Sequence, residues 1–482
     1  MLFNSLQFAF FLPVIFLLYW YATRQSVRLQ NYLMLAASYF FYACWDYRFL
    51  GLLIFSTLLD YFTAIQMANS TRQNQKRFWF WLSIAINLGF LGVFKYYNFF
   101  AASFADGLSL LGLKANPATL QVILPVGISF YTFHGLSYVI DIYNNKIKPE
   151  RNFVDYALFV SFFPLLVAGP IERATHLLPQ IQQPRVFDYT KAVDGLRQIL
   201  WGLFKKVVIA DNCAVIANAV FDGSANYPGS AHVIGAVFFA FQIYCDFSGY
   251  SDIAIGTARL FGIELLRNFS YPYFSRNIAE FWRRWHISLS SWFRDYLYIP
   301  LGGSKGSTWK KIRNVFIIFI VSGFWHGANW TFIVWGLLNA LFIIPSVIAR
   351  TNRNNLDVAA SGKTFPSFSE LASMIGTFGL TVFAWIFFRA ESLGHAGRYI
   401  AKIFSRSIFD QPNLQKTDVL LTTSFFILCL VLLEWRGRAN QHALADVGTK
   451  WRRPVRWVFY YGLLMAICVF AGSNQQFIYF QF

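Results

Sequence analysis

Long apolar segments recur along the whole chain and are separated by short polar or basic stretches. Roughly 20 helical residues cross a hydrocarbon core about 30 Å thick. Lipid offers no hydrogen-bond partner to an open backbone, so each segment is expected to be a helix. The expected helices cover residues 6–20, 32–45, 49–68, 78–94, 122–142, 233–255, 315–349, 371–388, 417–433 and 457–470. This pattern predicts an all-α polytopic membrane protein with about 11–13 transmembrane or re-entrant helices.

The segment between Arg313 and Arg350 differs from the others because both of its flanks are basic. It is long enough for two helical arms, and the stretch 322–329, which contains two glycines, divides it. At about 1.5 Å per residue, His326 lies roughly 20 Å from Arg313 along the helix axis, well inside the membrane. A broken helix at that depth is tolerated only where it packs in protein or lines a cavity. We therefore expect a helical hairpin with His326 at its break.

Composition agrees with a membrane protein, because only 13% of the residues are charged, compared with about 25% in soluble proteins. The net charge of +18 could indicate nucleic-acid binding. The basic residues lie in short loops, however, where the positive-inside rule accounts for them. The same rule places both chain ends outside, and the basic stretch 173–206 is expected to form amphipathic helices on the inner surface. We expect one membrane domain, 1–482, in which spans in 1–145 and 351–482 flank a core region, 146–350.

Two of the seven histidines stand where a histidine is hard to explain. An ionisable side chain at membrane depth is expensive, so His326 is interpreted as functional. A neutral imidazole in a dry pocket can take a proton from a hydroxyl group. The alternative is a neutral histidine that is hydrogen-bonded between helices. His286 lies in an aromatic and arginine-rich stretch, 281–295, on an inward-facing segment.

The basic residues around His286 are candidates for binding an anionic donor substrate. Arg283, Arg284, Arg294 and Lys305 could meet phosphate groups through charge-assisted hydrogen bonds. Trp285 and Trp325 precede the two histidines and complete this candidate set. The alternative is an interfacial amphipathic helix with snorkelling arginines and belt tryptophans.

Two carboxylates fall within a transmembrane segment, at Asp246 and Asp252. Buried aspartates need partners, so we expect them to be structural and to pair with inward-pointing arginines or to cap broken helices. A metal site is not expected, because the two histidines are about 40 residues apart and no cysteine or carboxylate stands at ligand spacing. The five cysteines are expected to be buried thiols.

Several motifs together resemble the membrane-bound O-acyltransferase (MBOAT) superfamily. Its features are Arg284-Trp-His-Ile-Ser-Leu-Ser290, followed by Gly323-Phe-Trp-His-Gly327. Other stretches are similar to the bacterial alginate O-acetyltransferase branch: Ala168-Gly-Pro-Ile171, Cys245-Asp-Phe-Ser-Gly-Tyr-Ser-Asp252, Tyr298-Ile-Pro-Leu-Gly-Gly303 and Phe477-Ile-Tyr-Phe-Gln-Phe482. The resemblance implies that His326 is the catalytic histidine and His286 a second functional one. It also implies a helical ring around a central funnel, entry of the acyl donor from the inner side, and delivery of the acyl group outward.

The expected function is therefore O-acetylation of an extracellular or periplasmic polysaccharide such as alginate, by a multi-pass protein of the bacterial inner membrane. The donor is expected to be acetyl-CoA or another acyl thioester, with no tightly bound cofactor. Expected partners are a periplasmic SGNH-type acetyltransferase or the polysaccharide machinery, and membrane lipid, but no nucleic acid. Alginate, cellulose, peptidoglycan and other glycans remain open as acceptors, since a fold does not determine them.

Two other classes of function are compatible with parts of the sequence. Many spans and buried histidines would suit a proton-coupled transporter. No inverted repeat is recognisable, however, and the charges gather on one face. A scaffold for an exopolysaccharide machine would not need two histidines at these positions.

The C-terminal tail carries a further candidate residue. Loop charges place residues 472–482 outside, and this aromatic stretch is too short to span the membrane but could fold back into an outer cavity. The phenol of Tyr479 could accept an acyl group and pass it to an outer partner, because a phenyl ester is reactive. The alternative is that Tyr479 is an ordinary membrane-interface anchor.

Overall fold

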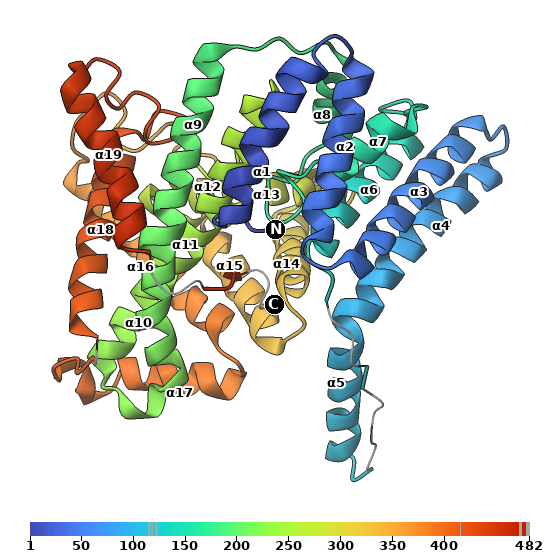
Figure 1. Cartoon of the computed structure of the whole chain (residues 1–482). Coiled ribbons are helices and arrows are strands. Elements are labelled where there is room, and N and C mark those ends of the chain that lie inside the picture. The colour runs from blue at the N-terminus through green and yellow to red at the C-terminus, as the bar shows by residue number, and fades with distance from the viewer. Residues whose placement is uncertain (114–115, 117–118, 121–123, 415, 472–474, 479–482) are drawn as a thin grey trace. The chain divides into compact units, whose positions relative to one another are not determined.

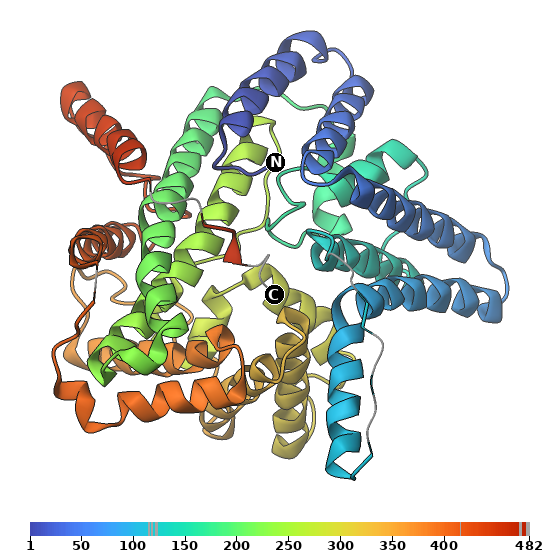
Figure 2. The same ribbon diagram turned by 60° about the horizontal axis from the view of Figure 1, so that its bottom comes forward.

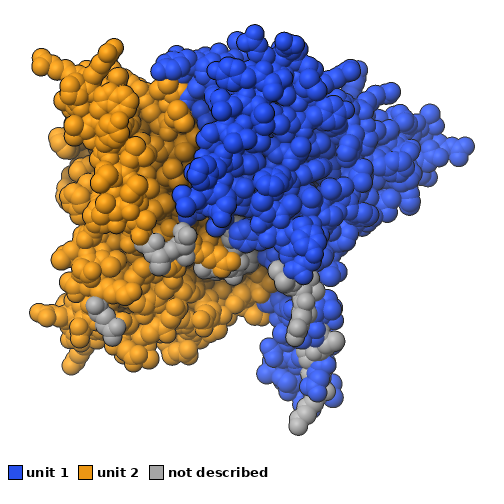
Figure 3. All heavy atoms as spheres, in the orientation of Figure 1, with its two compact units in different colours: residues 1–192, 257–266 blue, residues 193–256, 267–482 orange. Residues whose placement is uncertain are grey.

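The computed structural model describes the chain except residues 114–115, 117–118, 121–123, 415, 472–474 and 479–482. In the described part every regular element is a helix, which confirms the predicted all-α class (Figure 1). The chain divides into two compact units, one formed by residues 1–192 and 257–266, the other by 193–256 and 267–482 (Figure 3). The single domain expected from the sequence, with its divisions at 145 and 350, stays a prediction.

The first unit is built from the N-terminal helices. They are α1 (Leu6–Leu17), η1 (Leu18–Ala22), α2 (Val27–Ala43), α3 (Tyr47–Asn69), α4 (Gln73–Leu91), η2 (Gly92–Tyr96), α5 (Tyr97–Leu110), α6 (Ile128–Tyr143), α7 (Phe153–Ser161) and α8 (Ala174–Gln182). α3 and α4 run side by side in both views (Figures 1 and 2). The buried carboxylate of Asp60 joins them, because it accepts hydrogen bonds from Ser83 Oγ at 2.6 Å and Asn87 Nδ2 at 2.8 Å.

Helix α9 (Tyr189–Leu203) leads from the first unit into the second. The second unit continues with η3 (Phe204–Ala210), α10 (Asp211–Asp222), η4 (Ser224–Asn226), α11 (Gly229–Leu260), η5 (Pro272–Phe274), α12 (Ile278–Arg284), α13 (Ile287–Phe293), η6 (Arg294–Tyr298), α14 (Thr308–His326), α15 (Trp330–Ile348), α16 (Phe368–Arg389), α17 (Leu393–Ile403), η7 (Arg406–Phe409), α18 (Thr417–Arg436) and α19 (Arg453–Val469). The last four residues of α11 belong to the first unit.

Six helical stretches in the described residues are long and apolar enough to cross a membrane. They cover residues 47–69, 73–110, 229–260, 330–348, 368–389 and 417–436. α18 shows how such a helix suits lipid: Leu421, Phe425, Leu428 and Leu432 lie on one face and are 56–66% exposed. Its polar Glu434 is buried instead. The chain is therefore a multi-pass membrane protein, whereas the expected total of 11–13 helices and the central funnel stay predictions.

The hairpin expected around residue 326 is confirmed. α14 ends at His326, and α15 begins after the N-cap residue Asn329, whose side chain accepts from the amide of Thr331. Two glycines bring the arms together, since a Cβ on Gly323 would lie 2.3 Å from the carbonyl oxygen of Phe332, and one on Gly336 would lie 2.2 Å from that of Phe319. Small residues at such crossings let helix backbones approach closely within a membrane. This contact fixes the end of α14, and with it His326.

Candidate active site

His326 occupies the last position of α14 and is 4% exposed. Its ring contacts Trp325 at 4.8 Å between centroids, Trp335 of α15 at 5.1 Å and Phe388 of α16 at 5.3 Å. Three helices therefore surround this imidazole with aromatic side chains. An enclosure of this kind excludes water and favours the uncharged ring, the form that can take up a proton.

His286 lies between the short helices α12 and α13 and is 1% exposed. Its backbone is in the left-handed region, with φ 44° and ψ 54°, which is uncommon for a residue other than glycine. Strained backbone of this kind concentrates at functional sites, where the surrounding structure holds it. The left-handed conformation at His286 separates α12 from α13, so the side chain projects from a break between two helices.

A hydrogen-bond network fixes the orientation of the His286 ring. Its Nδ1 lies 3.0 Å from Oδ1 of Asn268, which also accepts from Ser288 Oγ at 2.9 Å. The Asn268 amide group in turn donates to Ser251 Oγ at 3.1 Å. Since an amide oxygen only accepts, Nδ1 carries the proton and Nε2 presents a lone pair. Within the described residues Nε2 has no hydrogen-bond partner.

Burial determines the charge of His286. It lowers the pKa of the imidazole to about 3, because it removes water from around the charged form. The ring is therefore neutral at physiological pH, with Nε2 free to accept a proton or a hydrogen bond.

The two histidines share one tryptophan. The indole of Trp325 lies 4.8 Å from His326 and 6.1 Å from His286, measured between ring centroids. On its other side His286 contacts Phe247 edge-on at 4.7 Å. The structure thus brings together the two histidines that the sequence singled out. Asn268 could not be recognised from the sequence, because it lies in a loop and belongs to none of the motifs described above.

Trp285 is buried among aromatic side chains. It is 1% exposed and packs among Phe269 at 5.1 Å, Phe281 at 5.5 Å and Trp385 at 5.0 Å. Trp385 stacks on Trp335, which contacts His326. Trp285 therefore belongs to the aromatic core that supports the two histidines.

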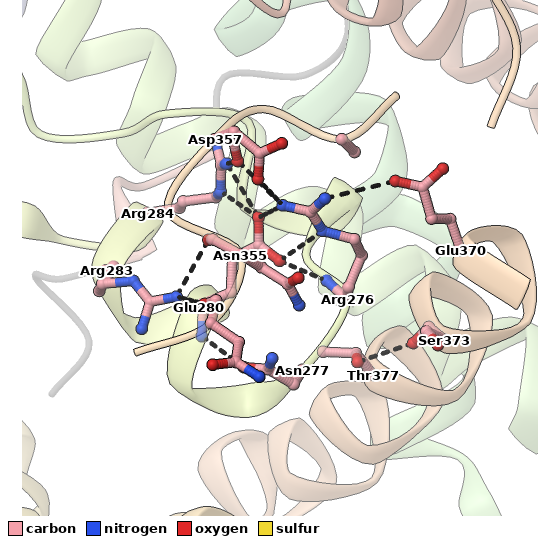
Figure 4. Close-up of polar contacts among 12 residues, drawn as sticks. Arg276, Asn277, Glu280, Arg283, Arg284, Asn355, Asp357, Glu370, Ser373 and Thr377 are labelled. Atoms are coloured by element: carbon pink, nitrogen blue, oxygen red, sulfur yellow. Dashed lines mark hydrogen bonds and ion pairs between the residues drawn. The ribbon is translucent and has the colours of Figure 1, made fainter. Parts of the chain in front are cut away.

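Arg284 takes part in an ion cluster around the buried Glu280. Its guanidinium pairs with Glu280 at 2.8 Å and donates to the carbonyl oxygen of Asp357 at 2.7 Å (Figure 4). Arg276 pairs with the same Glu280 and with Asp357 and Glu370. Glu280 is fully buried, and a buried carboxylate needs such partners. The structure therefore places Arg284 in a stabilising cluster.

Arg283 anchors the loop that follows α15. Its guanidinium donates to the carbonyl oxygens of Asn352 at 2.6 Å and Asn354 at 2.8 Å. It also donates to that of Asn355 at 3.2 Å (Figure 4). The loop so held carries Arg350 and Arg353.

A cavity of about 620 Å³ opens beside this loop. Its cationic lining consists of Arg283, Arg294, Lys311, Arg350 and Arg353. Its apolar lining includes Trp282, Val315 and Phe319. Arg294 is also paired with its neighbour Asp295 at 2.8 Å. The structure thus brings Arg283 and Arg294 together at one cavity, whereas Arg284 and Lys305 are not among its lining residues.

The additional cationic residues of the cavity were visible in the sequence but had another explanation. Arg350 and Arg353 follow an apolar segment, where the positive-inside rule accounts for basic residues. Lys311 lies near the start of α14, the first arm of the same hairpin. Only the fold brings them to one cavity. Trp282 lines the cavity, and its ring lies 5.7 Å from that of Trp335. Trp335 in turn contacts His326, so two tryptophans connect the cavity to this histidine.

Asp246 and Asp252 are both paired, as expected, but with lysines and not with arginines. Lys206 Nζ lies 2.7 Å from Asp246 Oδ1, and Lys205 Nζ lies 2.6 Å from Asp252 Oδ2. Both lysines come from η3, where the helix has π geometry. Tyr479, the remaining candidate, lies outside the described residues.

The sequence of this chain is similar to those of acyltransferases over most of its length. Residues 144–379 match the model of the membrane-bound O-acyltransferase family. The chain is 40% identical to the probable alginate O-acetylase AlgI of Azotobacter vinelandii, over 90% of this chain and 83% of that protein. It is 36% identical to the probable alginate O-acetylase AlgI of Pseudomonas putida, over the full length of both. It is 33% identical to the peptidoglycan O-acetyltransferase of Helicobacter pylori, over all of this chain and 98% of that protein.

The chain belongs to the membrane-bound O-acyltransferase family, and it is an O-acyltransferase. The resemblance inferred from its motifs is thereby confirmed.

Proposed function

We propose that this protein moves an acetyl group from a cytoplasmic thioester, acetyl-CoA, across the bacterial inner membrane for O-acetylation of an extracellular or periplasmic polysaccharide. The observation that carries the proposal is the arrangement of His326 and His286 around Trp325. The names of the similar proteins, an alginate O-acetylase and a peptidoglycan O-acetyltransferase, support a glycan hydroxyl as the final acceptor.

In this proposal His326 is the general base. An acceptor hydroxyl gives its proton to the imidazole while its oxygen attacks the thioester carbonyl. The C–S bond then breaks, and the imidazolium returns the proton to the departing thiolate. The aromatic enclosure of His326 supports this step, because it keeps the imidazole neutral before the reaction and keeps out water that would hydrolyse the thioester.

His286 assists from the other side of Trp325. Its Nε2 is an acceptor whose direction is fixed through Asn268. We assign it the role of orienting the acceptor or the donor through this nitrogen.

The cationic cavity is the proposed site for the phosphates of the donor. Arg294, Lys311, Arg350 and Arg353 offer charge-assisted hydrogen bonds to phosphate oxygens. The apolar part of the lining suits the less polar arm that bears the thioester. Its link through Trp282 and Trp335 to His326 supports the cavity as the approach to the reaction site.

Transfer to the glycan completes the proposed cycle. A periplasmic SGNH-type acetyltransferase, or another component of the polysaccharide machinery, takes the acetyl group. Tyr479 is the proposed carrier on this chain, because its phenol would form a reactive ester. Tyr479→Phe keeps the ring and removes only the hydroxyl, so full polysaccharide acetylation by this variant would exclude the carrier role.

The proposed function is tested by reconstituting the purified protein in liposomes with radiolabelled acetyl-CoA outside and a soluble oligosaccharide acceptor, with the partner acetyltransferase, inside. Label on the oligosaccharide that depends on His326 supports the proposal. Label that accumulates inside as unreacted donor would indicate a transporter instead.

A further inference from the structure

Three charged side chains, from η3, α10 and α11, are buried together. Lys206 Nζ lies 2.8 Å from Asp211 Oδ1 and 2.7 Å from Asp246 Oδ1. All three side chains are at most 4% exposed. The proposed reaction uses none of them. Because burying charges is costly, such a cluster needs an explanation beyond the packing of two helices.

The local backbone makes the cluster possible. η3 has π geometry, which is frequent at functional sites, and it directs the adjacent residues Lys205 and Lys206 to two different carboxylates of α11. Close packing brings the segments together: a Cβ on Gly202 would lie 2.5 Å from the carbonyl oxygen of Gly249, and one on Gly249 would lie 2.7 Å from that of Gly202.

The C-terminal segment 475–478 completes the cluster. Lys206 Nζ donates to the carbonyl oxygen of Gln475 at 3.2 Å. The amide of Ile478 donates to Asp246 Oδ2 at 2.8 Å. Phe477 and Ile478 are 2% and 1% exposed. Two backbone groups of the tail are therefore hydrogen-bonded to the buried charges.

The same segment reaches the surroundings of His286. The ring of Phe477 lies 4.8 Å from that of Tyr250 and 6.2 Å from that of Phe247. Phe247 contacts His286 edge-on at 4.7 Å. One side chain thus lies between the tail and a histidine of the candidate active site.

The charge balance explains why the cluster holds the tail. It contains one cation and two carboxylates, so an additional donor is favourable, and the amide of Ile478 supplies one. Apolar residues of similar volume would often stabilise a fold as well as a buried ion cluster does. Charged groups, unlike apolar ones, form hydrogen bonds only at defined positions. The bonds to Gln475 and Ile478 therefore select one register of the tail.

We propose that Lys206, Asp211 and Asp246 form a clamp that holds the C-terminal tail beside His286, and that acyl transfer requires the tail in this place. The three residues are positioning residues, which act through the tail and not on the substrate. The requirement for acyl transfer rests on the proposed function, whereas the clamp itself does not.

The test changes the tail and leaves the buried charges intact. Ile478→Pro removes the amide donor to Asp246, and Ile478→Val is the matched control, because it has similar volume and keeps the amide. In the full-length protein in liposomes, hydrogen exchange of the C-terminal peptide and acetyl transfer are measured together. We expect about tenfold faster exchange or more in Ile478→Pro, the factor typical of a lost charge-assisted hydrogen bond, and a similar loss of acetyl transfer. Ile478→Val should match the unmodified protein in both.

A second pair of variants tests the clamp from its other side. Lys206→Met should release the tail and speed its hydrogen exchange. Lys205→Met is the control, because Lys205 lies in the same helix, is equally buried and pairs with Asp252. This variant should leave the hydrogen exchange of the tail unchanged. Equal exchange in Ile478→Pro and Ile478→Val would overturn the clamp. A released tail with undiminished acetyl transfer would overturn its role in the reaction. If the unmodified protein transferred no acetyl group, the proposed function would fail, while the exchange rates would still decide the clamp.

Discussion

His286 donates a hydrogen bond from Nδ1 to Oδ1 of Asn268, over 3.0 Å. The bond sets the tautomer of a buried, neutral imidazole and directs Nε2 away from the network that holds the ring. Asn268 thus determines which ring nitrogen of His286 can accept a proton or a hydrogen bond.

Replacing Asn268 with Ala should impair the reaction without removing His286. The ring would lose the acceptor that fixes its tautomer, and kcat should fall by roughly tenfold or more. The measurement is the acetyl-transfer rate at matched membrane abundance. Ser251→Ala, which removes only the partner of the Asn268 amide group, should have a smaller effect. Equal rates for Asn268→Ala and the unmodified protein would show that the tautomer is irrelevant.

Part of this site could be predicted from the sequence. His326 and His286 stand out because an ionisable group in an apolar segment is costly, and the hairpin break at 322–329 follows from the length and flanks of one segment. The helices follow from apolar runs that only a membrane explains.

Other parts could not be predicted. Asn268 is an ordinary loop residue until the fold places it beside His286. Arg284 and Arg353 have the same chemistry in the sequence, yet one pairs with the buried Glu280 and the other lines the cavity. Glu280 is only four residues before Arg284, but the second partner of Arg284, the carbonyl oxygen of Asp357, is 73 residues further on, and only the fold brings it there.

The pH dependence of stability should reveal the buried His286. Burial lowers its pKa to about 3, whereas an unfolded histidine titrates near about 6.5. Between these values the unfolded state binds a proton that the folded state does not, so the free energy of unfolding decreases as the pH falls below about 6.5. His286→Gln lacks this contribution. Thermal unfolding in detergent should therefore depend less steeply on pH in the variant, and parallel curves would contradict the assignment.

Two arginines should respond differently to the same substitution. Arg353→Gln removes a cation from the cavity and should raise KM for acetyl-CoA with little change in kcat. Arg284→Gln leaves the buried Glu280 with one cation fewer and should lower membrane abundance instead. Donor titrations and immunoblots separate the two effects. An unchanged KM in Arg353→Gln would remove the cavity from the donor site.

The crossing of α9 and α11 should not tolerate a methyl group. Gly249→Ala would place its Cβ 2.7 Å from the carbonyl oxygen of Gly202, and such overpacking costs about 1–3 kcal/mol. Gly462→Ala in α19 is the control, because no atom lies within 4 Å of its added Cβ. The melting temperature in detergent should fall only for Gly249→Ala. An equal melting temperature for both variants would contradict the close packing.

The central claim, that His326 is the base for acyl transfer, is tested most directly by the acetyl-transfer rate of His326→Ala in liposomes. Aromatic side chains of three helices enclose the ring, and two of them, Trp335 and Phe388, also contact each other at 5.2 Å, so the variant should reach normal abundance. We predict a rate lower by about 10²-fold or more, the usual contribution of a general base. A rate equal to that of the unmodified protein, at equal abundance, would contradict the account.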